Sequence, residues 1–130
     1  MIKEIVQYIE DNTDFIIGTD LFAGFAPPEI EDCVIAIESG GRPNFYLTDY
    51  VEKTIQIVAR NKDYWKARDD ADEIYVLLHG QGGITLPKVG NGKEYYVNTM
   101  EAISVPQSVG QDEKGLFNIS TNFVLRIQDA

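Results

Sequence analysis

The hydrophobic period of the chain changes at Asn61, within residues 54–80, and this change constrains the fold more than any other feature of the sequence. Before Asn61 every second residue is apolar, which predicts a strand with one buried face. After Asn61 the apolar residues fall at steps of three and four, which predicts a helix that closes at His79-Gly80. The residues on these two buried faces are Ile55, Ile57 and Ala59 for the strand, and Tyr64, Ala67, Ala71, Ile74 and Leu78 for the helix. The segment therefore predicts one helix packed against one face of a sheet.

A second helix and further strands are predicted around this segment. Residues 2–12 repeat apolar side chains at helical spacing, which predicts a short amphipathic helix. Residues 90–92, with the sequence GNG, predict a hairpin turn. Residues 33–37 are continuously apolar, and the strand at 33–38 is expected at the centre of the sheet. The other expected strands cover residues 21–25, 84–89, 95–105 and 117–127. The expected architecture is one α+β domain over residues 1–130.

The last two predicted strands, residues 95–105 and 117–127, are unusually long and are joined by a polar loop at 106–115. At about 3.3 Å per residue they span roughly 35 to 40 Å, about twice the length of a typical strand. This length predicts a long C-terminal β-hairpin, part of which extends beyond the domain and pairs with another subunit, because exposed strand edges favour such addition. Polar residues on the outward side of the final strand are candidates for an oligomer interface or a lumen: Asn118, Ser120 and Asn122.

Residues 39–50 form a predicted loop of unusual composition. Two glycines and a proline interrupt regular structure, yet aromatic residues follow them. Two alternatives remain open, in which the loop either folds back over the domain or docks on a neighbouring molecule. A small monomeric binding module would instead use this loop as a ligand cleft. The candidate contact residues of the loop are Arg42, Phe45 and Tyr46.

The formal net charge of -10 is large for 130 residues. It argues against a protein that grips nucleic acid, because phosphate binding requires clustered Lys and Arg. It is compatible with a protein that DNA passes without sticking, since a negative wall repels phosphates. Simple solubility explains the same charge equally well.

No catalytic or metal-binding constellation is predicted. His79 is the only histidine, and its position at the end of the predicted helix favours an interaction with the helix C-terminal carbonyls. Cys33 is the only cysteine, and its apolar neighbours predict a buried thiol. A solvated acidic helix face is expected at Asp69, Asp70, Asp72 and Glu73. We therefore expect no enzyme, no cofactor and no metal.

The sequence also bears on location. No window of about eighteen apolar residues occurs, so no membrane span is expected. The N-terminal segment mixes charges into its first turns, so no signal peptide is expected. Synthesis in a reducing cytoplasm fits the single cysteine.

Several segments together resemble the bacteriophage minor capsid / tail terminator family of long-tailed phages. The similar segments are GTDLFAGFAP (residues 18–27), CVIAIESGGRP (33–43), IQIVARNKDYWKARDDADEIYVLLHG (55–80) and SVPQSVGQDEKGLFNISTNFVLRI (104–127). The joint from Arg60 to Tyr64 is the most characteristic piece. The loop that contains Asp112, Glu113 and Gly115, before the alternating strand, is the second. The resemblance covers nearly the whole chain.

The resemblance implies a structural virion protein, made in the bacterial host cytoplasm, that forms a homo-oligomeric ring, usually a hexamer. Such a ring sits at the head-proximal end of the tail, caps the tail tube, binds the head connector or completion protein, and lets DNA pass through its lumen. The implied fold is a mixed, mostly antiparallel sheet with two helices on one face. The family supplies no catalytic residues.

Within this role, we expect Asp112 and Glu113, at the tip of the final hairpin loop, to face either the lumen or a partner ring. A head-completion protein bound to the connector is the close alternative, because both kinds of protein are small α+β rings.

Overall fold

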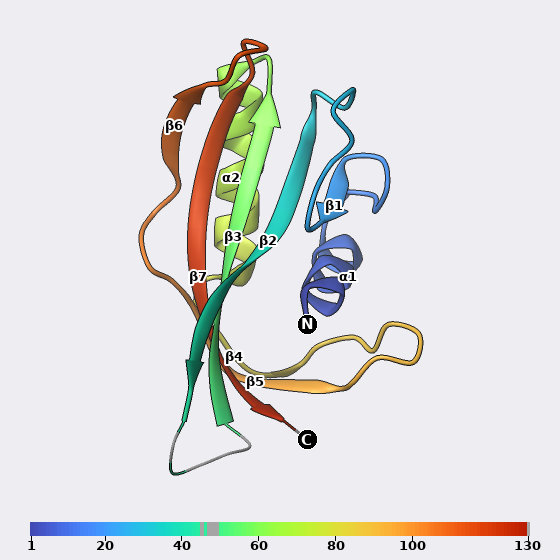
Figure 1. Ribbon diagram of the computed structural model, residues 1–130, viewed down its shortest axis with the longest axis vertical. Coiled ribbons are helices and arrows are strands. Elements are labelled where there is room, and N and C mark those ends of the chain that lie inside the picture. The colour runs from blue at the N-terminus through green and yellow to red at the C-terminus, as the bar shows by residue number, and fades with distance from the viewer. Residues whose placement is uncertain (45, 47–49, 130) are drawn as a thin grey trace.

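The computed structural model describes residues 1–44, 46 and 50–129 (Figure 1). Two helices and seven strands follow one another along this part of the chain. Their order is α1 (Ile2–Asn12), β1 (Leu21–Ala23), β2 (Cys33–Pro43), β3 (Tyr50–Asn61), α2 (Tyr64–Leu78), β4 (Gln81–Thr85), β5 (Tyr95–Ala102), β6 (Gln107–Gln111) and β7 (Phe117–Asp129). Among the described residues, no helix is long and apolar enough to span a membrane.

The seven strands form one sheet in the order β1-β2-β3-β7-β5-β4, with β6 also paired to β7. The β1–β2 pair is parallel and the other pairs are antiparallel. The α+β class and the mixed, mostly antiparallel sheet agree with the sequence prediction. β2 lies second from one edge rather than at the centre, because β3 and β7 take the middle positions.

The hydrophobic core lies between the sheet and the two helices. α2 buries Ala67, Ala71, Ile74 and Leu78, and α1 buries Ile5, Val6 and Ile9. These side chains join one cluster with alternate residues of β3 and β7, including Ile57 and Phe123. Both helices therefore pack against the same face of the sheet.

The switch from strand to helix at Asn61 is fixed by two short polar contacts. The backbone N–H of Asp63 donates to Asn61 Oδ1 at 2.9 Å, which turns the chain out of β3. Asp63 then caps α2, because its Oδ1 accepts the N–H of Trp65 at 3.0 Å. The change of period in the sequence thus coincides with a capped helix start.

The predicted loop at 39–50 is wrong for much of its length. β2 continues to Pro43 and β3 begins at Tyr50. The strand passes through the glycines because Gly40 and Gly41 adopt positive φ values of 98° and 147°, and the register with β3 shifts between Glu38 and Gly41. The predictions for Phe45 and for residues 47–49 of this loop lie outside the described residues. We refer to residues 39–43 of β2 and 50–54 of β3 as the arm, which projects beyond both helices (Figure 1).

The C-terminal region also differs from the prediction. β7, with 13 residues, extends two residues beyond the predicted strand at 117–127, and it has two partner strands along the edge that faces away from β3. β5 pairs with its C-terminal half and β6 with its N-terminal part. β6 occupies part of the predicted polar loop at 106–115, and β5 ends at Ala102. One long two-stranded hairpin is therefore not formed, and the register between β5 and β7 shifts between Val97 and Thr99.

Candidate interaction surface

The face of the sheet opposite the helices, which we call the open face, presents polar side chains of β7 beside apolar ones of β2 and β3 in its middle, such as Ile35 and Val58. Asn118, Ser120 and Asn122 of β7 lie there, paired in register with alternate residues of β3. Gln56 of β3 donates from Nε2 to Ser120 Oγ at 2.8 Å, and Ser120 is only 4% exposed. The three predicted polar residues therefore share one surface, on which Ser120 is held by its neighbour across the strands.

Charged residues form a row across the open face near the arm. Arg42, Glu52 and Arg126 are register partners on β2, β3 and β7. Arg126 donates from Nη2 to Glu101 Oε1 at 3.2 Å, and its Nε lies 3.5 Å from Glu52 Oε1. The hydrogen bond that Arg126 donates to the Glu101 carboxylate raises the pKa of Arg126. Sequence analysis missed this cluster, although alternating charges on neighbouring strands were the signal that could have revealed it.

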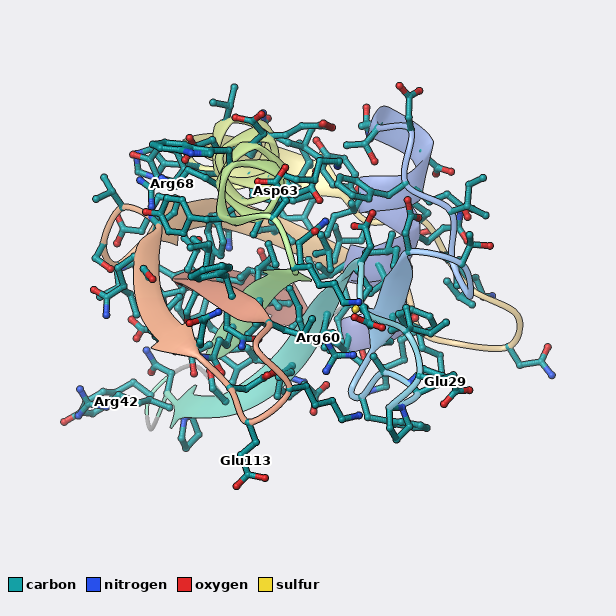
Figure 2. The ribbon with its side chains drawn as sticks, turned by 90° about the horizontal axis from the view of Figure 1, so that it is seen from above. Glu29, Arg42, Arg60, Asp63, Arg68 and Glu113 are labelled. Atoms are coloured by element: carbon teal, nitrogen blue, oxygen red, sulfur yellow. The ribbon has the colours of Figure 1, made fainter. Side chains whose placement is uncertain are left out.

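The arm carries the other predicted contact residues at one end of the molecule. Arg42 is exposed at the end of β2, and Tyr46 is 89% exposed beyond it. A cavity of about 310 Å³ lies along the arm and is lined by residues that include Gly41, Arg42 and Thr54. Arg42 points away from the molecule (Figure 2).

The turn between β6 and β7, at the other end of the sheet, contains Asp112 and Glu113. Asp112 Oδ1 accepts the backbone N–H groups of Lys114 at 2.9 Å and Leu116 at 3.0 Å, and Oδ2 lies 3.5 Å from Asn118 Nδ2. The hydrogen bond from Leu116 is the main cause that lowers the pKa of Asp112. Asp112 thus shapes the turn itself, whereas Glu113 points away from the molecule on the side opposite the helices (Figure 2).

The predicted residues therefore do not form one compact site. Asp112 and Asn118 come together at the turn, and Ser120 and Asn122 continue along β7. Arg42 and Tyr46 lie at the arm, near the opposite end of the long axis (Figure 1). An extended surface with two ends suits contacts with other protein chains better than it suits a small-molecule pocket.

The chemically reactive side chains lie in structural roles. Burial raises the pKa of the Cys33 thiol, which is fully buried. His79 Nδ1 accepts the backbone N–H of Ala102 at 3.0 Å. Its side chain therefore holds the end of β5 rather than the carbonyls at the end of the helix. Among residues 1–44, 46 and 50–129, no group of three or more His, Cys, Asp or Glu residues has a geometry that could hold a metal ion.

The predicted acidic face of α2 is divided by the structure. Asp69 is exposed, but Asp70 is only 4% exposed and forms an ion pair with Lys66. Asp70 therefore belongs to the packing between α2 and the segment after α1, where Phe15 and Asp20 line the same small cavity. The expectation of a fully solvated acidic patch is wrong for this residue, because its position on the helix turns it towards the protein.

The fold and its surfaces define a class of protein that works by contacts with other chains: a small α+β scaffold with a bare sheet face and projecting strands. The chain belongs to the bacteriophage tail terminator family, since the family model described as "Bacteriophage tail terminator protein" matches residues 8–129. No curated protein matches the chain. The family is structural rather than enzymatic, and it places the chain in the phage virion, in contact with components of the tail.

Proposed function

We propose that this chain, as one domain over residues 1–130, forms a ring that caps the head-proximal end of the phage tail tube. The ring stops polymerisation of the tube and then presents a surface to the head connector or completion protein. The match to the tail terminator family over residues 8–129 is the observation that carries this proposal. Newly made subunits are supplied from the host cytoplasm and end in the virion.

The ring consists of copies of this chain alone, and we propose six of them. A ring of one subunit type requires head-to-tail contacts between two different surfaces of each copy. The projecting arm and the unpaired edges of β4 and β6 provide such surfaces. DNA passes through the lumen without sequence-specific contacts, and the net charge of -10 favours its passage because phosphates are repelled.

The individual residues take separate parts in this proposal. Arg42 and the aromatic residues Phe45 and Tyr46 belong to the arm contact, and Glu113 faces the lumen or a partner ring. Asp112 supports Glu113 through the hydrogen bonds of the turn. Asn118 and Asn122 line the interface or lumen on the open face, where their neutral polarity avoids strong attachment to phosphate. Ser120, which is buried between them, supports this surface through its hydrogen bond with Gln56.

Binding to purified tail tubes of the same phage tests the function. The chain is added to tubes that lack a terminator, together with fresh tube protein, and tube lengths are measured by electron microscopy. We expect a ring at one end of each tube and no further growth from that end. A chain that leaves the tube ends bare but binds isolated connectors is instead a head-completion protein.

A further inference from the structure

The outward side of α2 combines exposed apolar and acidic residues. Four residues lie at helical spacing on the side of α2 that faces away from its buried residues, such as Ala71 and Ile74. They are Trp65, Asp69, Asp72 and Val76. Trp65 is 71% exposed and Val76 is 74% exposed. A large aromatic and a branched apolar side chain at this exposure are unusual on a helix that already has a buried face, and they indicate a contact surface.

A neighbouring segment adds to this surface. Residues 102–106, which we call the strap, connect β5 to β6 and are tied to α2 at both ends. The N–H of Ala102 donates to His79 Nδ1 at 3.0 Å, and Arg68 donates from Nη1 to the carbonyl of Pro106 at 2.9 Å. Between these ties Ile103 is 64% exposed and Val105 is 62% exposed. The strap thus holds two further apolar side chains in fixed positions beside the helix.

The loop between β4 and β5, residues 86–94, has the opposite charge character. It contains Lys88, Lys93 and Glu94, so it carries one net positive charge in a chain whose net charge is -10. Its turn at residues 90–92 lies beside α1, since a Cβ built on Gly92 would be close to the Glu4 side chain, while Lys88 is exposed. Figure 1 shows this loop projecting from one side of the molecule, with the strap and β6 at the opposite side.

We propose that the loop at 86–94 of a second copy of this chain docks on the surface formed by α2 and the strap. Lys88 would approach Asp69 and Asp72, and Pro87 and Val89 would cover the apolar residues beside them. The two surfaces are different parts of one molecule and have opposite charge character, and a closed ring of one subunit type requires head-to-tail contacts between two such different surfaces. The inference rests on the proposed ring and adds a contact between its subunits to those proposed above for the arm and the strand edges.

Charge exchange tests this contact. Lys88→Glu and Asp69→Lys are each expected to raise the concentration of chain needed to cap half of the tube ends by about tenfold or more, because each places like charges together. The combined variant is expected to return close to the wild-type value. Lys62→Glu is the matched control: its charge change equals that of Lys88→Glu, and Lys62 is an exposed residue whose ion pair is with Glu31 instead. Thermal melting confirms that each variant is folded.

A covalent test is independent of charge. Val76→Cys and Val89→Cys are introduced together, and mild oxidation of capped tubes is followed by non-reducing gels; Cys33 is fully buried and provides the background in the wild-type chain. Intermolecular ladders support the contact. The contact is overturned if wild-type rings form on tube ends but the combined charge variant does not recover capping and no crosslinked ladders appear. That result leaves the proposed function intact. Failure of the wild-type chain to assemble or to bind tube ends overturns both.

Discussion

The bulge in the β2 segment of the arm depends on Gly41. Replacing Gly41 with alanine therefore tests whether the close pairing of the two strands of the arm requires a glycine there. A Cβ atom at Gly41 would lie 2.0 Å from the carbonyl oxygen of Glu52, whereas real Cβ contacts stay beyond 3.0 Å. The strands would have to separate by about 1 Å, and Gly41 also has a φ of 147°. The adjacent Gly40 has a φ of 98°, but a Cβ there meets nothing within 4 Å. Gly40→Ala is therefore the matched control, with the backbone cost and without the collision.

The magnitudes follow from this difference. Gly40→Ala is expected to cost about 1 kcal/mol, the usual penalty for an L-residue at positive φ. Gly41→Ala adds the steric collision with β3, so we expect a total loss of stability of about 3 kcal/mol or more. The loss cannot exceed the free energy of opening the arm locally, because the arm then opens instead. Beyond that value the arm separates while the core stays folded, because the core cluster lies under the helices.

Hydrogen exchange measured by mass spectrometry distinguishes these cases. Gly41→Ala should lose protection in residues 50–54 of β3 and keep it in residues 55–61, while Gly40→Ala should change both segments little. Tube capping should weaken in Gly41→Ala alone. Equal protection of residues 50–54 in the two variants would refute the close approach of the strands and the role we assign to the bulge.

Three further predictions concern the core and two carboxylates. Phe123→Ala should lower the free energy of unfolding by about 3–5 kcal/mol in a urea titration, because the ring is fully buried in the core cluster; a loss below about 1 kcal/mol would contradict the packing. Asp112→Ala should lower the melting temperature at neutral pH. Its folded pKa is lowered, so its stabilisation is present above the unfolded value of about 3.9 and disappears as the pH falls through the folded value; an effect of equal size in acid would exclude this cause. Burial raises the pKa of Asp70, so its contribution favours the fold most below about 3.9 and is lost as the pH rises through the raised folded value. The free energy of unfolding of Asp70→Asn should therefore fall less than that of the wild type between pH 4 and pH 7. An equal shift of the urea midpoint in the variant and the wild type between these pH values would argue against this cause.

The parts of the fold that could be predicted from sequence are those in which local pattern and tertiary packing agree. The change of period at Asn61 located the end of β3 and the start of α2, because the alternating residues and the helical residues bury into the same core. The acidic α2 positions were harder to interpret. Asp70 and Asp69 are neighbours in sequence, but only Asp70 turns towards the segment after α1. Its ion pair with Lys66 offsets only part of the cost of burial, because its pKa stays raised.

The arm and the strap could not be predicted because their conformations depend on distant partners. Two glycines and a proline usually end a strand, yet Gly40 and Gly41 form a bulge that β3 continues to pair with. The strap depends on Arg68 and His79, which lie more than twenty residues away from the atoms they bind. The row of Arg126 with Glu52 and Glu101 likewise requires the register of three strands, which the sequence does not specify.

Cryo-electron microscopy of tail tubes mixed with this chain tests the central claim most directly. The account predicts a closed ring of identical subunits at one end of each tube, with an open lumen and no growth of that end when tube protein is added. Bare tube ends that continue to grow at saturating concentrations of the chain would contradict it.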